Sequence, residues 1–123
     1  MKKLITLLAC VSPSLAWAQS AVDVDPQHYQ LVFENDCVRV VRAKYGLGEH
    51  NAGPYQTNGG VVIALTDLNG QRTTDDGQTA TVTKKSGDAY WATPGKIKSL
   101  VNMSDQPAEW IAVVPKGKAG CTK

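Results

Sequence analysis

Polar side chains that could do chemistry gather in the stretch Gly48–Asp67, which begins as a loop rich in Gly, Asn and Pro and ends as an apolar run. His50 could act there as a general acid or base, because imidazole changes its charge near neutral pH, and Glu49 is its nearest carboxylate. The alternative is an exposed loop histidine without a catalytic role. Loops that feed a buried strand often carry binding residues, so this stretch is the first candidate for a site.

Hydroxyl and aromatic side chains supply the other candidates. Tyr55 and Thr57 follow in the same loop and could hydrogen-bond a ligand, or they could fill space at the mouth of the fold. Tyr90 and Trp91, together with Trp110, could form an aromatic wall for a sugar or a planar ligand. The alternative is packing, because aromatic residues in short strands are more often part of a core.

Short strands must position these residues. Alternating apolar residues and β-branched or aromatic runs predict strands at 29–35, 38–45, 61–65, 79–83, 89–92, 97–102 and 109–114. Asn69-Gly70 and Asp76-Gly77 each suit a two-residue hairpin turn. About eight antiparallel strands without a convincing helix predict an all-β fold, a single small jelly-roll barrel or sandwich.

The N-terminus reads as a secretory signal peptide over residues 1–18. A basic pair, Lys2-Lys3, precedes the apolar run Leu4–Val11, and the small residues around Trp17 predict cleavage after Ala18. The mature protein would then be periplasmic or secreted. Cys10 offers an alternative, the lipid-attachment cysteine of a lipoprotein.

The mature chain divides into a leader and one domain. Residues 19–28 show no periodicity and are predicted to be a flexible leader, and residues 29–123 form the domain. Removing Lys2 and Lys3 from 13 basic residues brings the net charge close to zero against 11 acidic residues. We therefore expect no nucleic-acid partner, and no membrane partner after signal cleavage. Cys37 and Cys121 are the two remaining cysteines, and in an exported chain they predict a disulfide.

The spacing of residues near the C-terminal half resembles the second motif of the cupin family, small jelly-roll barrels. That motif, G-x5-P-x-G-x2-H-x3-N, is matched in spacing by Gly87, Thr93, Gly95, Lys98 and Asn102. Thr93 replaces the motif's proline and Lys98 replaces its metal-binding histidine. In the family's first motif, the two histidine positions fall on Tyr55 and Thr57.

The resemblance implies a cupin-like fold whose metal ligands have been replaced. A catalytic metal needs about three His, Cys or carboxylate ligands. The mature chain has only two histidines, His28 and His50, in the predicted leader and in the loop, and none of the matched ligand positions holds such a residue. We therefore expect no metal and no cofactor. The motif also implies that Lys98 points into the barrel, where it could bind an anion or act as a base. Alternatively, Lys98 only replaces the positive charge of the lost metal.

Three functions follow from these observations. The first is an exported, metal-free, cupin-like protein that binds a small molecule or acts as an accessory. The second is a metal-independent isomerase or lyase that uses Lys98, His50 or Tyr55 for proton transfer. The third is a structural protein that forms a homodimer through a sheet. The sequence leans towards a protein that is not an enzyme.

Overall fold

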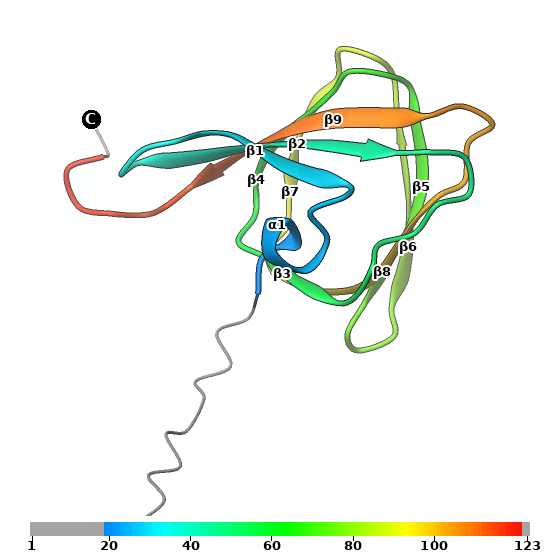
Figure 1. Cartoon of the computed structure of the whole chain (residues 1–123), viewed down its shortest axis with the longest axis horizontal. Coiled ribbons are helices and arrows are strands. Elements are labelled where there is room, and N and C mark those ends of the chain that lie inside the picture. Colours follow the sequence, from blue (N-terminus) through cyan, green and yellow to red (C-terminus); the bar gives the residue numbers. More distant parts are fainter. Residues whose placement is uncertain (1–18, 122–123) are drawn as a thin grey trace, which may run out of the picture.

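The computed structural model describes residues 19–121 (Figure 1). The signal peptide, the cleavage after Ala18 and the alternative role of Cys10 concern residues outside this range. One short helix and nine strands follow one another along the chain: α1 Ala21–Val24, β1 Tyr29–Glu34, β2 Val38–Tyr45, β3 Tyr55–Thr57, β4 Gly60–Ala64, β5 Leu68–Thr74, β6 Thr79–Lys84, β7 Ala89–Ala92, β8 Gly95–Asn102 and β9 Ala108–Pro115. No helix between residues 19 and 121 has the length and apolar character to cross a membrane.

The strands form two antiparallel sheets. One sheet has the order β1-β2-β9-β4-β7 and the other the order β3-β8-β5-β6. Figure 1 shows β5, β6 and β8 on one side of the molecule and the β1-β2-β9 layer running along its top, so the two sheets enclose a common interior. Strands adjacent in a sheet are mostly not consecutive in sequence, as in a jelly roll. The predicted all-β jelly-roll fold is therefore confirmed.

The core is built from the inner faces of the strands and is rich in tyrosine and alanine. Its buried members are Tyr29, Val41, Ala43, Tyr45, Ala64, Leu68 and Ala108. Alanine side chains fill little space between the sheets. This composition leaves part of the interior unfilled, which matters for the site described below.

The sequence analysis predicted a flexible leader at residues 19–28, and in the structure this segment packs against the domain. Ala21 and Val22 in α1 pack against the core cluster. The carboxylate of Asp25 is 1% exposed and accepts the backbone N–H of Ala52 at 3.1 Å. These contacts come from residues far along the chain, so no local periodicity in the segment could reveal them.

The Asn69-Gly70 pair is also not a turn. It lies inside β5, where a Cβ atom at Gly70 would come within 3.2 Å of the carbonyl oxygen of Val101 in β8. The glycine therefore permits close approach of two strands. The second predicted turn does join β5 to β6, and Gly77 has a φ of +86° there, but residues 75–78 separate the strands, so it is longer than a two-residue hairpin turn. The strand β3 was missed because it is only three residues long.

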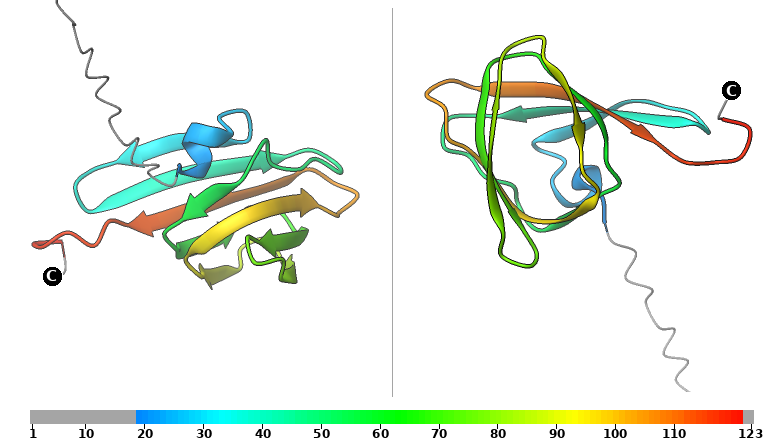
Figure 2. Two further views of the ribbon diagram at one scale, coloured as in Figure 1. Left: turned by 90° about the horizontal axis from the view of Figure 1, so that it is seen from below. Right: turned by 180° about the vertical axis from the view of Figure 1, so that it is seen from behind.

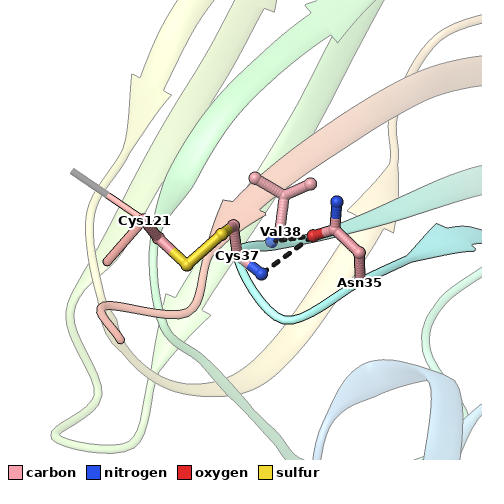
Figure 3. The surroundings of a disulfide bond; sticks show 4 residues. All are labelled: Asn35, Cys37, Val38 and Cys121. Atoms are coloured by element: carbon pink, nitrogen blue, oxygen red, sulfur yellow. Dashed lines mark hydrogen bonds between the residues drawn. A yellow bond between two sulfur atoms is a disulfide. The ribbon is translucent and has the colours of Figure 1, made fainter. Parts of the chain in front are cut away.

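The tip of the β1–β2 hairpin and the tail after β9 project together from the rest of the fold (Figures 1 and 2). The disulfide between Cys37 and Cys121 joins them, with the two Cα atoms 5.2 Å apart (Figure 3). Asn35 Oδ1 accepts the backbone N–H groups of Cys37 and Val38 and so shapes the turn that presents Cys37. The predicted pairing is present in the structure.

Candidate functional site

The interior between the two sheets holds a cavity of about 200 Å³. Its apolar wall includes side chains from both sheets: Val41, Val62, Leu68, Val82, Ile97 and Leu100. Its polar and charged lining includes Tyr29, Tyr45, Tyr55, Tyr90, Arg39 and Arg72. Ala21 and Val22 of α1 also line it, so the segment predicted to be a leader forms part of the wall. A concave apolar site with a few polar groups is the usual form of a small-molecule pocket.

A glycine pair shapes the rim of this cavity. A Cβ atom at Gly59 would lie 2.8 Å from the carbonyl oxygen of Ala92, and one at Gly60 would lie 2.2 Å from that of Val113. Both glycines have positive φ angles, +78° and +146°. Only glycine fits such positions, and it lets β4 start directly against β7 and β9.

Three tyrosine hydroxyls form a hydrogen-bonded chain that ends at the cavity. Tyr45 Oη donates to Tyr29 Oη at 2.8 Å, and Tyr29 Oη donates to Tyr55 Oη at 3.1 Å. The ring of Tyr45 stacks on Trp110, with centroids 5.3 Å apart, and the Tyr29 ring meets that of Tyr45 edge-on. In this chain Tyr55 accepts, and its own O–H donates to no group within residues 19–121. Tyr55 therefore has a proton to offer a ligand.

Burial keeps these hydroxyls protonated. It raises the pKa of Tyr29 well above its usual range, and it also raises the pKa of Tyr45. Burial raises the pKa of Tyr55 too, although the hydrogen bond from Tyr29 and the charge of Arg72 oppose this rise. Each hydroxyl stays neutral near pH 7, so it serves as a hydrogen-bond donor or acceptor and not as a phenolate base.

Among the described residues, two arginines are the only charged side chains that line the cavity. Arg39 Nε lies 3.1 Å from Glu34 Oε2, and Arg39 Nη1 donates to Ser20 Oγ at 3.3 Å. Arg72 forms no ion pair and no side-chain hydrogen bond with any residue from 19 to 121. The cavity is therefore positively charged, and one of its two charges has no protein partner in this range.

The structure brings three of the predicted site residues together. Tyr55, Thr57 and Tyr90 all line the cavity. Thr57 Oγ1 accepts the backbone N–H of Gly59 at 3.2 Å, so it also stabilises the turn at the rim. Arg72 was missed by the sequence analysis, because a single arginine in a polar strand carries no motif.

Lys98 is exposed and does not point into the barrel. The buried residue at this place in β8 is Ile97, which is 1% exposed. Thr74 of β5 pairs with Ile97 and Thr73 pairs with Ser99, so Lys98 is the extra residue of a β-bulge. A bulge reverses the inward and outward alternation of a strand, which is why the spacing of the motif predicted the wrong direction.

His50 and Trp91 are also outside the cavity. His50 is exposed, and its Nδ1 lies 2.9 Å from the carbonyl oxygen of Asn51. Trp91 is 59% exposed, because Tyr90 before it faces inward and neighbouring residues in a strand face opposite sides. The predicted aromatic wall therefore contains Tyr90 and Trp110 but not Trp91.

A second polar cluster surrounds His28, which the sequence analysis placed in the leader. His28 Nδ1 lies 2.7 Å from Asp25 Oδ2, and His28 Nε2 lies 2.5 Å from Glu49 Oε2. The imidazole also stacks on the ring of Tyr45, with centroids 4.3 Å apart. The Asp-x-x-His spacing is the only local signal for this cluster, because Glu49 lies 21 residues away.

The charge state of His28 follows from its two carboxylate partners. Burial lowers the pKa of His28, but the hydrogen bonds to Glu49 and Asp25 outweigh this effect, and the net shift is upward. With a carboxylate at each ring nitrogen, the protonated imidazolium of His28 can donate to both. The cluster therefore ties two segments together.

The side chains at this site do not fit a catalytic metal. Within residues 19–121, no three His, Cys, Asp or Glu side chains come together as a metal site requires. At the family's ligand positions, Tyr55 and Thr57 offer neutral hydroxyls, and Lys98 faces away. We therefore derive no chemistry through a metal at this site.

Comparison with known proteins identifies which solved structures share this architecture. No protein-family model and no curated protein matches the sequence. Solved structures do match, among them a cupin domain from Bordetella pertussis Tohama I, with a TM-score of 0.63 and 20% identity over 72% of this chain and 91% of that chain. The chain has the cupin fold. An uncharacterised double-stranded β-helix protein from Klebsiella pneumoniae matches with a TM-score of 0.56 and 20% identity, over 82% of this chain and 90% of that chain.

The cupin fold hosts different activities, so the likeness shows the fold alone. A polyketide cyclase from Streptomyces resistomycificus also matches, with a TM-score of 0.54 and 15% identity over 80% of this chain and 73% of that chain. Function must therefore be argued from the cavity of this chain itself.

Proposed function

We propose that this cupin is an exported protein that binds a small molecule in the cavity between its sheets, without a catalytic metal. The observation that carries the proposal is the cavity of about 200 Å³, which combines an apolar wall with hydroxyl and guanidinium groups. Enzymatic proton transfer has less support, because Lys98 and His50 are exposed and the buried tyrosines stay protonated. Binding without chemistry agrees best with this set of side chains.

A ligand panel tested by thermal unfolding checks the proposal. A ligand that binds only the folded state raises the unfolding free energy by about 2.7 kcal/mol at 100 times its Kd, so the midpoint temperature rises. Val82→Trp should abolish the shift, because Val82 lines the cavity and the indole would fill it. Thr83→Trp is the matched control, since Thr83 is exposed on the same strand. A ligand whose shift survives Val82→Trp would place the site elsewhere.

Export has its own test. The disulfide between Cys37 and Cys121 suits an oxidising compartment, and the carbonyl oxygen of Gln19 accepts the backbone N–H of Gln56 at 2.9 Å. A chain cut after Ala18 would thus keep a first residue that contacts the domain. Intact-mass measurement of protein from the periplasm or medium should give a chain that begins at Gln19. A lipid-modified chain that begins at Cys10 would contradict this.

A second candidate function is homodimerisation, and one surface feature favours it. Five paired residues form a continuous apolar row across all strands of the larger sheet: Phe33, Val40, Val113, Val61 and Trp91. Directly paired residues share a face, and Val61 and Trp91 are exposed on the outer one. Four strand spacings make this row about 19 Å long.

The row suits a second copy of the chain. It has bulky aromatic rings at both ends and valines between them, so a twofold axis near Val113 would lay Phe33 against Trp91 of the partner subunit. Val61→Lys should convert such a dimer to a monomer in light scattering, whereas Leu47→Lys should not. Leu47 is 60% exposed in the loop after β2, away from the row. A monomeric wild-type protein at millimolar concentration would exclude this interface.

A further inference from the structure

The charges around the cavity are unbalanced. No Asp, Glu, Lys or His side chain of residues 19–121 lines it, whereas Arg39 and Arg72 do. Arg39 has a carboxylate partner, Glu34, at 3.1 Å. The Arg72 guanidinium has no ion pair and no side-chain hydrogen bond between residues 19 and 121, so it is available to an anionic group that enters the cavity from outside. Arg72 is the residue that such a group would meet.

The strand geometry directs Arg72 inward. Leu68 of β5 is buried and Gln71 is exposed, so alternation places Arg72 on the same face as Leu68. On the neighbouring strand β6, Lys84 Nζ lies 4.6 Å from the centroid of the Tyr90 ring. This ammonium group adds to the positive potential beside Tyr90, although Lys84 pairs with Leu68 and so lies four residues along β5 from Arg72.

Two neutral hydroxyls accompany the guanidinium group. Burial raises the pKa of Tyr55 and of Tyr90, and the charge of Arg72 opposes the rise at both. Arg72 therefore lies within electrostatic range of phenols from β3 and β7, which belong to different sheets. Both phenols stay protonated and can donate.

We propose that the ligand of this cavity is a small organic monoanion with an apolar body, whose carboxylate is held by Arg72 and the hydroxyls of Tyr55 and Tyr90. This assignment rests on the proposed binding function. A guanidinium group matches a carboxylate with two parallel hydrogen bonds. A dianion such as phosphate would bring a second negative charge with no partner on the cavity wall. The cavity volume of about 200 Å³ limits the ligand to a small body.

Matched pairs of acids and amides test the assignment by calorimetric titration. Benzoate is compared with benzamide, and hexanoate with hexanamide, because each pair differs in charge and hardly in size. At least one carboxylate should bind the wild-type protein at least tenfold more tightly than its amide. Arg72→Met should remove this preference by weakening carboxylate binding more than amide binding. Arg42→Met is the matched control, because Arg42 faces Glu109 outside the cavity.

The outcomes distinguish failure of the monoanion assignment from failure of the proposed binding function. Amide binding that equals or exceeds carboxylate binding would overturn the monoanion assignment and leave cavity binding intact. A preference that survives Arg72→Met would overturn it as well. If no compound of the wider panel binds at all, both proposals fail. If Arg72→Met fails to fold, Tyr90→Phe replaces it as the test. This variant keeps the aromatic ring and the charge of Arg72 but removes the Tyr90 hydroxyl, so a weaker preference for the carboxylate would support the assignment.

Discussion

Ile97 and Lys98 are neighbours in β8 with opposite environments. Ile97 is buried between the sheets, and Lys98 is exposed at the bulge opposite Thr73 and Thr74. Whether a side chain faces the cavity or the solvent therefore changes from one residue to the next, and a bulge of one residue exchanges the two directions. The same reasoning brings Arg72 into the cavity and puts Trp91 outside it.

This contrast predicts different effects of two substitutions. Ile97→Ala should lower the free energy of unfolding by about 2–5 kcal/mol, because it leaves a cavity in the core. Lys98→Met should change it by less than about 0.5 kcal/mol, as expected for an exposed residue. Urea denaturation followed by circular dichroism measures both. Loss of ligand binding in Lys98→Met would show that the lysine reaches the site after all.

The segment from α1 to the start of β1 forms part of the cavity wall, which the sequence analysis did not predict. It lines the cavity through Ala21 and Val22, and His28 ties it to the loop that carries Glu49. Without this segment, one wall of the interior would be open. Residues shortly after the predicted cleavage site thus form part of the cavity wall.

The link through His28 should depend on pH. The folded-state pKa of His28 lies above its usual 6.5, so its contribution to stability is fully present below about pH 6.5 and is lost as the pH rises through the folded-state value. The hydrogen bond to His28 lowers the pKa of Glu49 below its usual 4.5, so the contribution of Glu49 is present above about pH 4.5 and is lost as the pH falls through the folded-state value. Stability from this pair should therefore be greatest between these limits.

His28→Gln tests the link, because glutamine can hydrogen-bond but does not titrate in this range. Wild-type protein should lose its advantage over the variant as the pH is raised above 6.5. Chemical denaturation at a series of pH values measures the difference between the two proteins. An advantage that does not vary with pH would mean that the histidine acts through packing on Tyr45 alone.

At the scale of the whole molecule, the disulfide closes a span of 84 residues and ties the β1–β2 hairpin to the tail after β9. Neither cysteine lines the cavity. The bond therefore belongs to the stability of the molecule and not to the site. Figure 2 shows the β1–β2 hairpin and the tail after β9 projecting from the rest of the fold, and Figure 3 shows the disulfide that joins them.

Replacing both cysteines by serine should lower the free energy of unfolding by about 4 kcal/mol, since the unfolded chain gains loop entropy. Affinity for the cavity ligand should stay the same. Thiol titration of the denatured, unreduced mature protein should find no free thiol. Two free thiols per chain would show that the bond does not form in solution.

The sequence alone determined the class of fold, because strand signals and turn residues act locally and recur along the chain. It also predicted the cysteine pairing, since Cys37 and Cys121 are the only two cysteines after the predicted cleavage site and leave one intramolecular choice. Tyr55, Thr57 and Tyr90 were candidates for ligand contact or for packing, and in the structure they line the cavity.

Only the tertiary structure decided which side chains meet. His28 finds Glu49 across 21 residues, and the apolar row from Phe33 to Trp91 depends on the register of five strands. A bulge in β8 turns Lys98 outward, and the unpaired charge of Arg72 is apparent only against a wall with no carboxylate among the described residues. These features depend on pairing between distant segments, and strand register leaves no trace in the local pattern of any one strand.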